Sequence, residues 1–292
     1  MVPIVLVSVA AVAVTSIQFG TVGWLTNAFG SIAGGCAELR PIVIAADPSI
    51  APALTTVAAQ FDEADGNCTT TEIRSVVSAD AAALFASGVA GDLDAWVPDS
   101  SAWLDRSVTM ATSLGLAAPE FELGDYIAST PVVQAATASQ VSDLTETPLS
   151  WMALLTRTAS TLLPDPESSG ASLAGLAQLK SVSSDTDPRQ FAGAMIAMGK
   201  TIPQSAAAAF EIVTAAKVPT VVVTTEREVA AYNASSPASP MIALYPSDGT
   251  VKLTYPFVEV LGDAQESAAA ASGSACRCGS LLCRRVSRRR FP

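Results

Sequence analysis

The sequence predicts an α/β protein of two lobes, and three observations support this prediction. The chain has 292 residues, enough for two modest domains that each bury a core. Segments of strand and helix character alternate along it, an order typical of parallel sheets covered by helices. Hydroxyl-rich loops follow several of the predicted strands. Ligands of open α/β sheets bind beyond the carboxyl ends of the strands, so these loops are expected to form a ligand site.

An apolar segment begins the chain. Residues 1–37 contain no charged side chain, and residues 1–25 are long enough to cross a hydrocarbon core of roughly 30 Å as a helix. We interpret residues 1–25 as a transmembrane anchor or a signal helix, and the Gly-, Ser- and Ala-rich residues 26–37 as a tether. The protein is therefore expected at the cell membrane as a single-pass protein, or secreted, with its folded part outside the cytoplasm.

The first lobe is expected to comprise residues 38–130 and 235–263. An apolar run at 39–45 suits a buried strand, and residues from Ile50 to Phe61 then recur at helical spacing. The remaining elements of this lobe are predicted as strands at 70–77 and 95–97, helices at 79–86 and 101–114, and late extended stretches at 241–245 and 253–260.

The second lobe is expected to comprise residues 131–234. It begins where Pro131 interrupts an extended stretch at 126–136. Its elements are predicted as helices at 148–158, 172–182, 188–199, 205–210 and 226–233, and strands at 160–163 and 218–224. Residues 264–292 are expected to be a disordered basic tail, because the composition changes there to Arg, Cys and Ser.

Composition excludes several classes of function. The chain has 27 Asp and Glu against 16 Lys and Arg, and six of its Arg lie in the tail. An acidic surface repels phosphate backbones, so no nucleic-acid partner is expected. The absence of His removes the commonest general base near neutral pH and the commonest metal ligand. We therefore predict that the protein is not an enzyme and that it has neither a cofactor nor a metal site.

Cysteines fall at the two ends of the chain. Cys36 and Cys68 flank the first predicted strand and helix, and an extracytoplasmic location would permit a disulfide between them. The tail cysteines Cys276, Cys278 and Cys283 offer three zinc ligands without a fourth. We expect no metal ion there.

The loops after the first and third strands supply candidate ligand-binding residues. Ser49 lies in a turn before a helix, where it can cap the helix or contact an anionic or carbonyl oxygen. Asp99, Ser100 and Ser101 lie between Trp96 and Trp103. The Trp rings could stack on an organic solute and the polar groups bind it, but the alternative is that both rings belong to the core and the polar groups cap a helix.

Two further loops offer hydroxyl groups. Ser168, Ser169 and Gly170 form a turn that runs into a helix and has the makings of an oxyanion site, or of an ordinary capped loop. Ser129 and Thr130 lie where the chain is expected to cross between the lobes. Either their hydroxyls face a cleft, or the segment is simply a bent strand.

Three segments resemble type II periplasmic-binding-protein domains. They are residues 44–54, 94–103 and 129–133, and the resemblance extends over about residues 36–262. It is strongest to the solute-binding domain that precedes the von Willebrand factor A domain in membrane-anchored bacterial surface proteins, although the chain departs from that pattern after about Val260. An A domain and its metal site are therefore not expected.

The resemblance implies two lobes that are joined by crossover strands and close on a small oxyanion or a polar organic solute. It places six residues in the cleft: Ser49, Ser100, Ser101, Ser129, Ser169 and Gly170. It also implies a Cys36–Cys68 disulfide and a role as a receptor or transport-associated domain, with a transporter or surface protein as partner. The alternative is a non-catalytic structural or interaction module on the cell surface.

Overall fold

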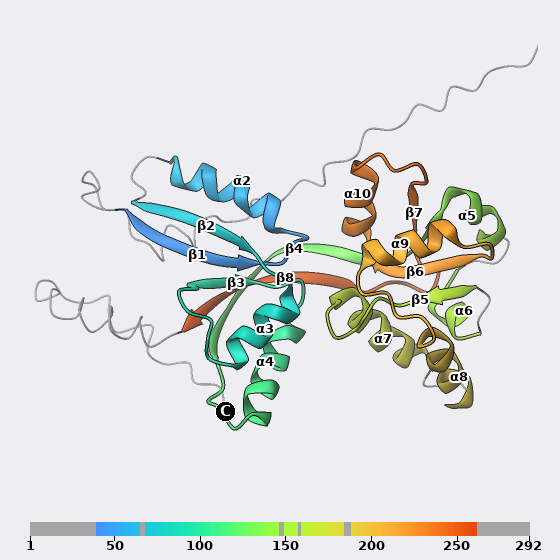
Figure 1. Ribbon diagram of the computed structural model, residues 1–292, viewed down its shortest axis with the longest axis horizontal. Coiled ribbons are helices and arrows are strands. Elements are labelled where there is room, and N and C mark those ends of the chain that lie inside the picture. The colour runs from blue at the N-terminus through green and yellow to red at the C-terminus, as the bar shows by residue number, and fades with distance from the viewer. Residues whose placement is uncertain (1–38, 65–67, 146–148, 157–158, 184–187, 262–292) are drawn as a thin grey trace, which may run out of the picture.

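The computed structural model describes residues 39–64, 68–145, 149–156, 159–183 and 188–261 (Figure 1). The predicted anchor at 1–25, the tether at 26–37 and the tail at 264–292 lie outside the described residues. Within the described ranges, no helix has both the length and the apolar character needed to span a membrane.

The first lobe is a five-stranded sheet between two layers of helices. Strand β1 (Arg40–Ala46) pairs in parallel with β2 (Thr69–Ser75) on one side and β3 (Ala95–Val97) on the other. Strand β8 (Lys252–Leu261) pairs antiparallel with β3 and with the first part of the long strand β4 (Glu120–Thr137). The helices of this lobe are α2 (Ala51–Asp62), α3 (Ser78–Ala86) and α4 (Ala102–Ser113). Helix α2 covers one face of the sheet, and α3 and α4 cover the other (Figure 1).

The second lobe is built on the second part of β4. This part pairs antiparallel with β6 (Thr220–Thr225) and β7 (Met241–Leu244), and β6 pairs in parallel with β5 (Ser160–Leu162). Every residue of β6 is buried, as expected for a β-branched strand covered on both faces. The helices around this sheet are α5 (Ala138–Thr145), α6 (Trp151–Leu155), α7 (Gly170–Val182), α8 (Pro188–Met198), α9 (Ala206–Ala215) and α10 (Glu226–Ala234).

Two strand connections join the lobes (Figure 1). Strand β4 runs through both sheets, and β8 begins beside it where the chain returns from the second lobe. At this crossing the Val132 N–H donates to the carbonyl of Val251 at 2.9 Å. The lobes are thus connected by two adjacent extended segments, an arrangement that allows them to hinge.

Each sheet buries apolar side chains on both faces. In the first lobe, Ile44 packs on the α2 side, whereas Ala45, Trp96 and Trp103 pack on the α3 and α4 side. In the second lobe α7 lies especially close to the sheet, since a Cβ atom built on Gly175 would lie 2.8 Å from Cγ1 of Val223. Four hydrophobic clusters, two in each lobe, account for this packing among the described residues.

The structure corrects the predicted lobe boundary at residue 235. Strand β7 pairs with the segment of β4 from Gln134 to Thr137, so residues up to about 250 belong with the second lobe and the chain returns at Val251. The prediction of parallel sheets is right for β1–β2, β1–β3 and β5–β6, but wrong for every pair that β4 or β8 makes. The hydrophobic pattern of a segment indicates that it is a strand, but not whether it runs parallel or antiparallel to a partner that is distant in the sequence.

Cys68 precedes β2, where its carbonyl accepts a hydrogen bond from the Arg40 N–H at 2.9 Å. It is disulfide-bonded, and every other cysteine of the chain lies outside the described residues. Its pairing with Cys36 therefore stays a prediction.

Candidate functional site

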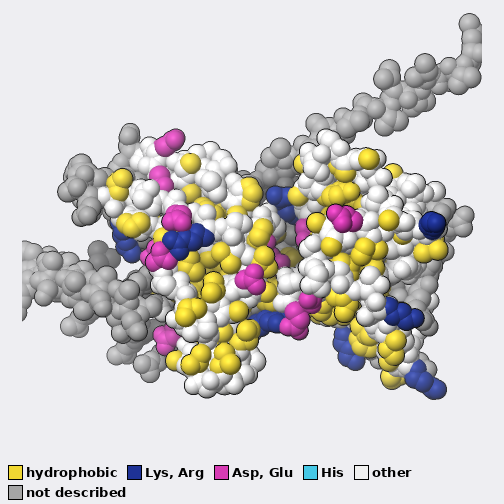
Figure 2. All heavy atoms as spheres, viewed as in Figure 1, with side chains coloured by type: hydrophobic (Ala, Val, Ile, Leu, Met, Phe, Trp, Pro, Cys, Tyr) yellow, Lys and Arg dark blue, Asp and Glu magenta, His cyan; other side chains and the backbone are white. Residues whose placement is uncertain are grey.

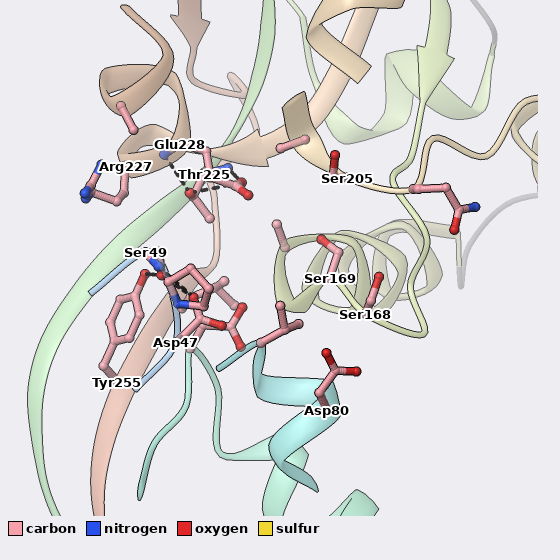
Figure 3. A pocket seen from close by; sticks show the side chains of 18 residues that line it. Asp47, Ser49, Asp80, Ser168, Ser169, Ser205, Thr225, Arg227, Glu228 and Tyr255 are labelled. Carbon is pink, nitrogen blue, oxygen red and sulfur yellow. Dashed lines mark hydrogen bonds between the residues drawn. The ribbon is translucent and has the colours of Figure 1, made fainter. Parts of the chain in front are cut away.

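A cavity of about 480 Å³ lies between the two lobes. Charged side chains border the groove that separates the lobes on the surface (Figure 2). In close view, Asp47 and Asp80 lie on one side of the cavity, and Thr225 and Ser205 lie on the opposite side (Figure 3). Both lobes therefore contribute polar groups to one space.

Asp47 organises the wall that the first lobe contributes. It follows β1, and one of its carboxylate oxygens accepts hydrogen bonds from the Ser49 N–H at 3.0 Å and the Ser49 hydroxyl at 2.6 Å. The other oxygen accepts from the Ser78 N–H at 3.2 Å and the Ser78 hydroxyl at 2.7 Å. Asp47 thus joins the turn before α2 to the first turn of α3, and four hydrogen bonds hold its position.

Tyr255 reaches this wall from β8. Its hydroxyl lies 2.8 Å from the hydroxyl of Ser49, and because that hydroxyl already donates to Asp47, the Tyr255 O–H is the donor between them. Burial is the main cause that raises the pKa of Tyr255, so the phenol stays protonated at physiological pH. The Tyr255 oxygen therefore offers the cavity an acceptor.

Asp99 follows β3 and is held from both sides. Its backbone N–H donates to the Ser78 hydroxyl at 3.0 Å, and the Trp103 indole N–H donates to its Oδ1 at 2.5 Å. Burial, and then the nearby charge of Asp47, raise the pKa of Asp99 to about 7. Both the neutral and the charged form of this side chain are therefore accessible near neutral pH.

Three helix N-termini form most of the wall that the second lobe contributes. The Ser169 hydroxyl caps α7 by accepting from the Ser172 N–H at 3.2 Å, and the Ser205 hydroxyl caps α9 by accepting from the Ala208 N–H at 3.2 Å. Thr225 and Glu228 form a capping box at the start of α10. The positive ends of three helix dipoles therefore lie at the cavity.

Arg227 is the one Lys or Arg among the residues that line the cavity. Its backbone N–H donates to the hydroxyl of Thr130 at 3.2 Å, which ties α10 to the crossover strand β4. Its guanidinium makes no ion pair with any described residue. A half-buried cation at a cavity rim is available to an incoming solute.

Four of the nine predicted ligand-binding residues line the cavity: Ser49, Asp99, Ser168 and Ser169. The other five do not line it and hold positions in the fold instead. Ser100 accepts from the Ala102 N–H at 3.2 Å, Ser101 is the N-cap residue of α4, and Ser129 pairs with Thr254 between β4 and β8. Thr130 is buried and holds α10, and Gly170 packs against the carboxylate of Asp99.

The prediction that Trp96 and Trp103 stack on a solute is wrong. Both side chains are 0% exposed. The ring of Trp96 packs 4.9 Å from that of Phe85 and 5.8 Å from that of Phe121. The alternative that both belong to the core is correct, because both rings are part of the apolar cluster between the first-lobe sheet and helices α3 and α4. Neither Trp lines the cavity, whereas a structural or interaction module would be expected to fill its cleft with side chains such as these.

Sequence reasoning missed eight polar residues that line the cavity: Asp47, Asp80, Gln204, Ser205, Thr225, Arg227, Glu228 and Tyr255. The segment Thr225-Glu226-Arg227-Glu228 carries a capping-box signal that marks a helix start after a strand, and Asp47 directly follows a strand. Both signals are visible in the sequence and could have marked these residues as candidates for the site. Tyr255 carries none, because only the antiparallel placement of β8 brings it to the cavity. No cluster of His, Cys, Asp or Glu able to hold a metal occurs in the described ranges.

Comparison with known proteins identifies the family. The model of the family described as bacterial extracellular solute-binding protein matches residues 42–272. The solved structure of a periplasmic thiamin binding protein is similar with a TM-score of 0.58 at 14% identity, covering 83% of this chain and 79% of that one. The sulfate-binding protein SubI from Mycobacterium tuberculosis H37Rv is similar with a TM-score of 0.55 at 18% identity, covering 80% and 79%. Iron-bound HitA from Pseudomonas aeruginosa gives a TM-score of 0.54 at 15% identity, covering 76% and 75%.

No curated protein matches the sequence significantly. The solved structures share the two-lobed α/β architecture, which confirms the predicted type II periplasmic-binding-protein fold. The family is one of solute binding and not of catalysis, so the protein is not an enzyme. Because the family model matches most of the chain, this protein belongs to the bacterial extracellular solute-binding proteins.

Proposed function

We propose that the protein holds a small polar organic solute in the cavity between its lobes, as an extracytoplasmic receptor or transport-associated domain. One observation carries this proposal: hydroxyl, carboxylate and guanidinium groups from both lobes line a single cavity of about 480 Å³. Small-molecule sites typically have volumes of roughly 300–1,000 Å³ and a few converging polar groups. The cavity is therefore suited to a solute of ordinary metabolite size.

The charge of the lining favours an organic solute over a bare oxyanion. Four carboxylates line the cavity, those of Asp47, Asp80, Asp99 and Glu228, against the single guanidinium of Arg227. An oxyanion without apolar or cationic parts would lie near several like charges, whereas an organic solute can contact hydroxyls and N–H groups as well as carboxylates. Proteins of the same fold bind sulfate in one case and thiamin in another, so the fold accommodates both classes.

Contacts on one side of the cavity support closure of the lobes around a solute. Leu173 of α7 packs against the first-lobe cluster that contains Trp103. Arg106 of α4 forms an ion pair with Glu167, which lies just before α7. Helix α7 thus docks on the start of α4, while the crossover strands β4 and β8 leave the lobes free to hinge elsewhere.

The family description supports a location outside the cytoplasm. We place residues 1–25 in the membrane as an anchor, or in a signal segment that is removed, and a transporter or surface protein as the partner, in keeping with the resemblance to von Willebrand factor A domain surface proteins. Protease treatment of intact cells tests the location. Degradation of the folded domain without lysis is expected, and full protection would contradict it.

Thermal unfolding of the full chain with a panel of amino acids, amines, sugars, sulfate and phosphate tests the function. A bound solute at a hundred times its Kd stabilises the folded state by about 2.7 kcal/mol, which is readily detected as a rise in Tm. Folded protein that responds to no member of the panel would count against the proposal.

A matched pair of variants tests whether a stabilising solute uses this cavity. Ala231 lines the cavity from α10 and is exposed, and its neighbour Ala230 is exposed on the same helix without lining it. Ala231→Trp is expected to abolish the rise in Tm because the indole fills the cavity, and Ala230→Trp is expected to retain it. Equal responses from both variants would move the site elsewhere.

A further inference from the structure

Four carboxylates meet in the cavity when the lobes are together. Three belong to the first lobe and one to the second, and they are those of Asp47, Asp80, Asp99 and Glu228. Arg227 supplies the one guanidinium among the lining residues. Each like charge nearby makes it harder for a carboxyl group to lose its proton, so closure of the lobes favours the protonated form of at least one of the four.

Asp99 is the carboxylate of this group with the least support for a negative charge. The carboxylate of Asp47 accepts four hydrogen bonds, and that of Glu228 accepts three. Asp80 accepts none from a described residue, but its side chain is exposed to water. Asp99 is half-buried and accepts one hydrogen bond, from the Trp103 indole at 2.5 Å. Because hydrogen bonds and water both stabilise a carboxylate, Asp99 is the group that takes up a proton first.

The contact between Asp99 and Gly170 makes the hydration of this carboxylate depend on closure. A Cβ atom built on Gly170 would lie 2.8 Å from Oδ1 of Asp99 and closer still to Oδ2. Among the described residues, none other than Trp103 donates a hydrogen bond to the Asp99 carboxylate, so α7 removes water here without replacing its hydrogen bonds. Opening of the lobes would return water to this side of Asp99 and take the charge of Glu228 away from it. Both changes favour the charged form.

The charges around Asp99 act mainly against its ionisation. The elements that surround it carry these titratable or charged side chains: Asp47 after β1, Asp80 of α3, Arg106 of α4, Glu167 before α7, Arg227 and Glu228 of α10, and Tyr255 of β8. Arg106 pairs with Glu167 and Tyr255 stays protonated, which leaves Arg227 against three carboxylates. The positive end of the α7 dipole favours the charged form of Asp99, but such a dipole lowers a pKa by at most about 1.5. Burial, with the charges of Asp47 and Glu228, raises the pKa of Asp99 by more than this, from 3.8 to about 7.

We infer that closure of the lobes takes up one proton from water at the Asp99 carboxylate, so that acidic pH favours the closed arrangement and alkaline pH favours the open one. The closed arrangement has the raised pKa, so its advantage is present at low pH and is lost as the pH rises through about 7. Between the pKa values of Asp99 in the open and closed arrangements, the ratio of closed to open molecules is expected to fall by up to about tenfold per pH unit. This coupling requires no solute, and with a solute in the cavity it favours release at the higher pH.

Förster resonance energy transfer between the lobes tests the inference in the full chain without solute. Donor and acceptor dyes are attached through non-natural amino acids at Thr56 and Ala230, which are exposed positions on α2 of the first lobe and α10 of the second. A second pair at Thr56 and Thr109, both exposed in the first lobe, controls for the response of the dyes themselves to pH. Between about pH 5 and pH 8 the transfer efficiency is expected to fall for the first pair and to stay constant for the second.

Three variants test whether a pH-dependent change belongs to Asp99. Asp99→Asn cannot ionise, so at both pH values it is expected to keep the efficiency that the wild type has at the lower pH. Asp105→Asn removes an exposed acid of the first turn of α4 that does not line the cavity, and should respond as the wild type does. Gly170→Ala, which displaces α7 from Asp99, should remove the response by holding the lobes apart, so the test does not depend on how Asp99→Asn folds.

Two results overturn the inference: no change in the wild type between the two pH values, or the same change in Asp99→Asn as in the wild type. Either result leaves the proposed function standing, because no solute is present in the experiment.

Discussion

The carboxylate of Asp99, in the first lobe, packs against Gly170, the first residue of α7 in the second lobe. A Cβ atom built on Gly170 would lie 2.8 Å from Cγ of Asp99, closer than side chains tolerate. Position 170 therefore suits a glycine because the Asp99 carboxylate leaves no room for a Cβ atom, and not because the backbone there has a positive φ. This contact sets how closely the lobes approach on the α7 side of the cavity.

Gly170→Ala is expected to separate the lobes without unfolding them. Ala is a better helix residue than Gly, so α7 itself should tolerate the change, but the added methyl group meets Asp99. Small-angle X-ray scattering should show a larger radius of gyration, and solute binding should weaken. The double variant Asp99→Ser with Gly170→Ala, in which the shorter side chain makes room, should restore the radius. An unchanged radius in Gly170→Ala would contradict this role for the contact.

Asp99 is expected to make stability depend on pH. Burial and the charge of Asp47 raise its pKa from 3.8 to about 7, and Glu228 acts in the same direction, while the hydrogen bond from Trp103 opposes them. Between pH 3.8 and about 7 the native Asp99 side chain keeps a proton that the unfolded chain has released. The stability that this proton contributes is therefore present at low pH and is lost as the pH rises through about 7.

Asp99→Asn removes this titration and keeps an oxygen for the Trp103 indole. Relative to the wild type, the variant should therefore gain stability as the pH rises from about 5 to about 8. Urea unfolding at the two pH values measures the difference in the free energy of unfolding. A difference that does not change with pH would show that Asp99 titrates normally.

Arg106→Gln is expected to change stability little. The ion pair of Arg106 with Glu167 bridges the lobes, but the Glu167 side chain is 73% exposed. Exposed pairs typically contribute about 0–1 kcal/mol because water and salt screen them. Urea unfolding should therefore give a loss below about 1 kcal/mol, with Glu167→Gln giving a similar value. A loss of several kcal/mol would show that this pair, and not the apolar contact of Leu173, holds the lobes together.

Gln134 is expected to reduce the stability of the second lobe. Its side chain is 0% exposed near the end of β4, and neither its amide nitrogen nor its amide oxygen has a hydrogen-bond partner among the described residues. An unsatisfied buried polar group costs about 1–3 kcal/mol. Gln134→Met, which has a similar shape, should therefore raise Tm. A fall in Tm would indicate that the amide has a partner in solution.

The sequence predicted most elements of the fold. The apolar run of β1, the β-branched run of β6 and the periodic apolar residues of α2 each carry a local signal that the structure confirms. Helix α5 was not predicted, because it continues directly from the end of β4 with no turn residue between them. The direction of β8 and the lobe of β7 depend on distant pairing, which no local pattern contains.

The candidate site was predicted only where a loop carried hydroxyl groups. Ser49, Ser168 and Ser169 follow strands or precede helices and line the cavity as expected. Arg227 is the second residue of helix α10, and Tyr255 lies inside strand β8, so only the packing of the lobes brings them to the cavity. The two Trp residues misled the prediction because amphipathic aromatic residues are equally typical of cores and of ligand sites.

Hydrogen exchange of the full chain with and without a stabilising solute tests the central claim most directly. A solute between the lobes should slow exchange at the N-termini of α3 in the first lobe and of α7 and α9 in the second, because all three contribute to the cavity. Helix α8, which does not line the cavity, is the internal control. Slower exchange in both lobes together is the predicted result. Protection confined to one lobe, or located at α8, would contradict a site between the lobes.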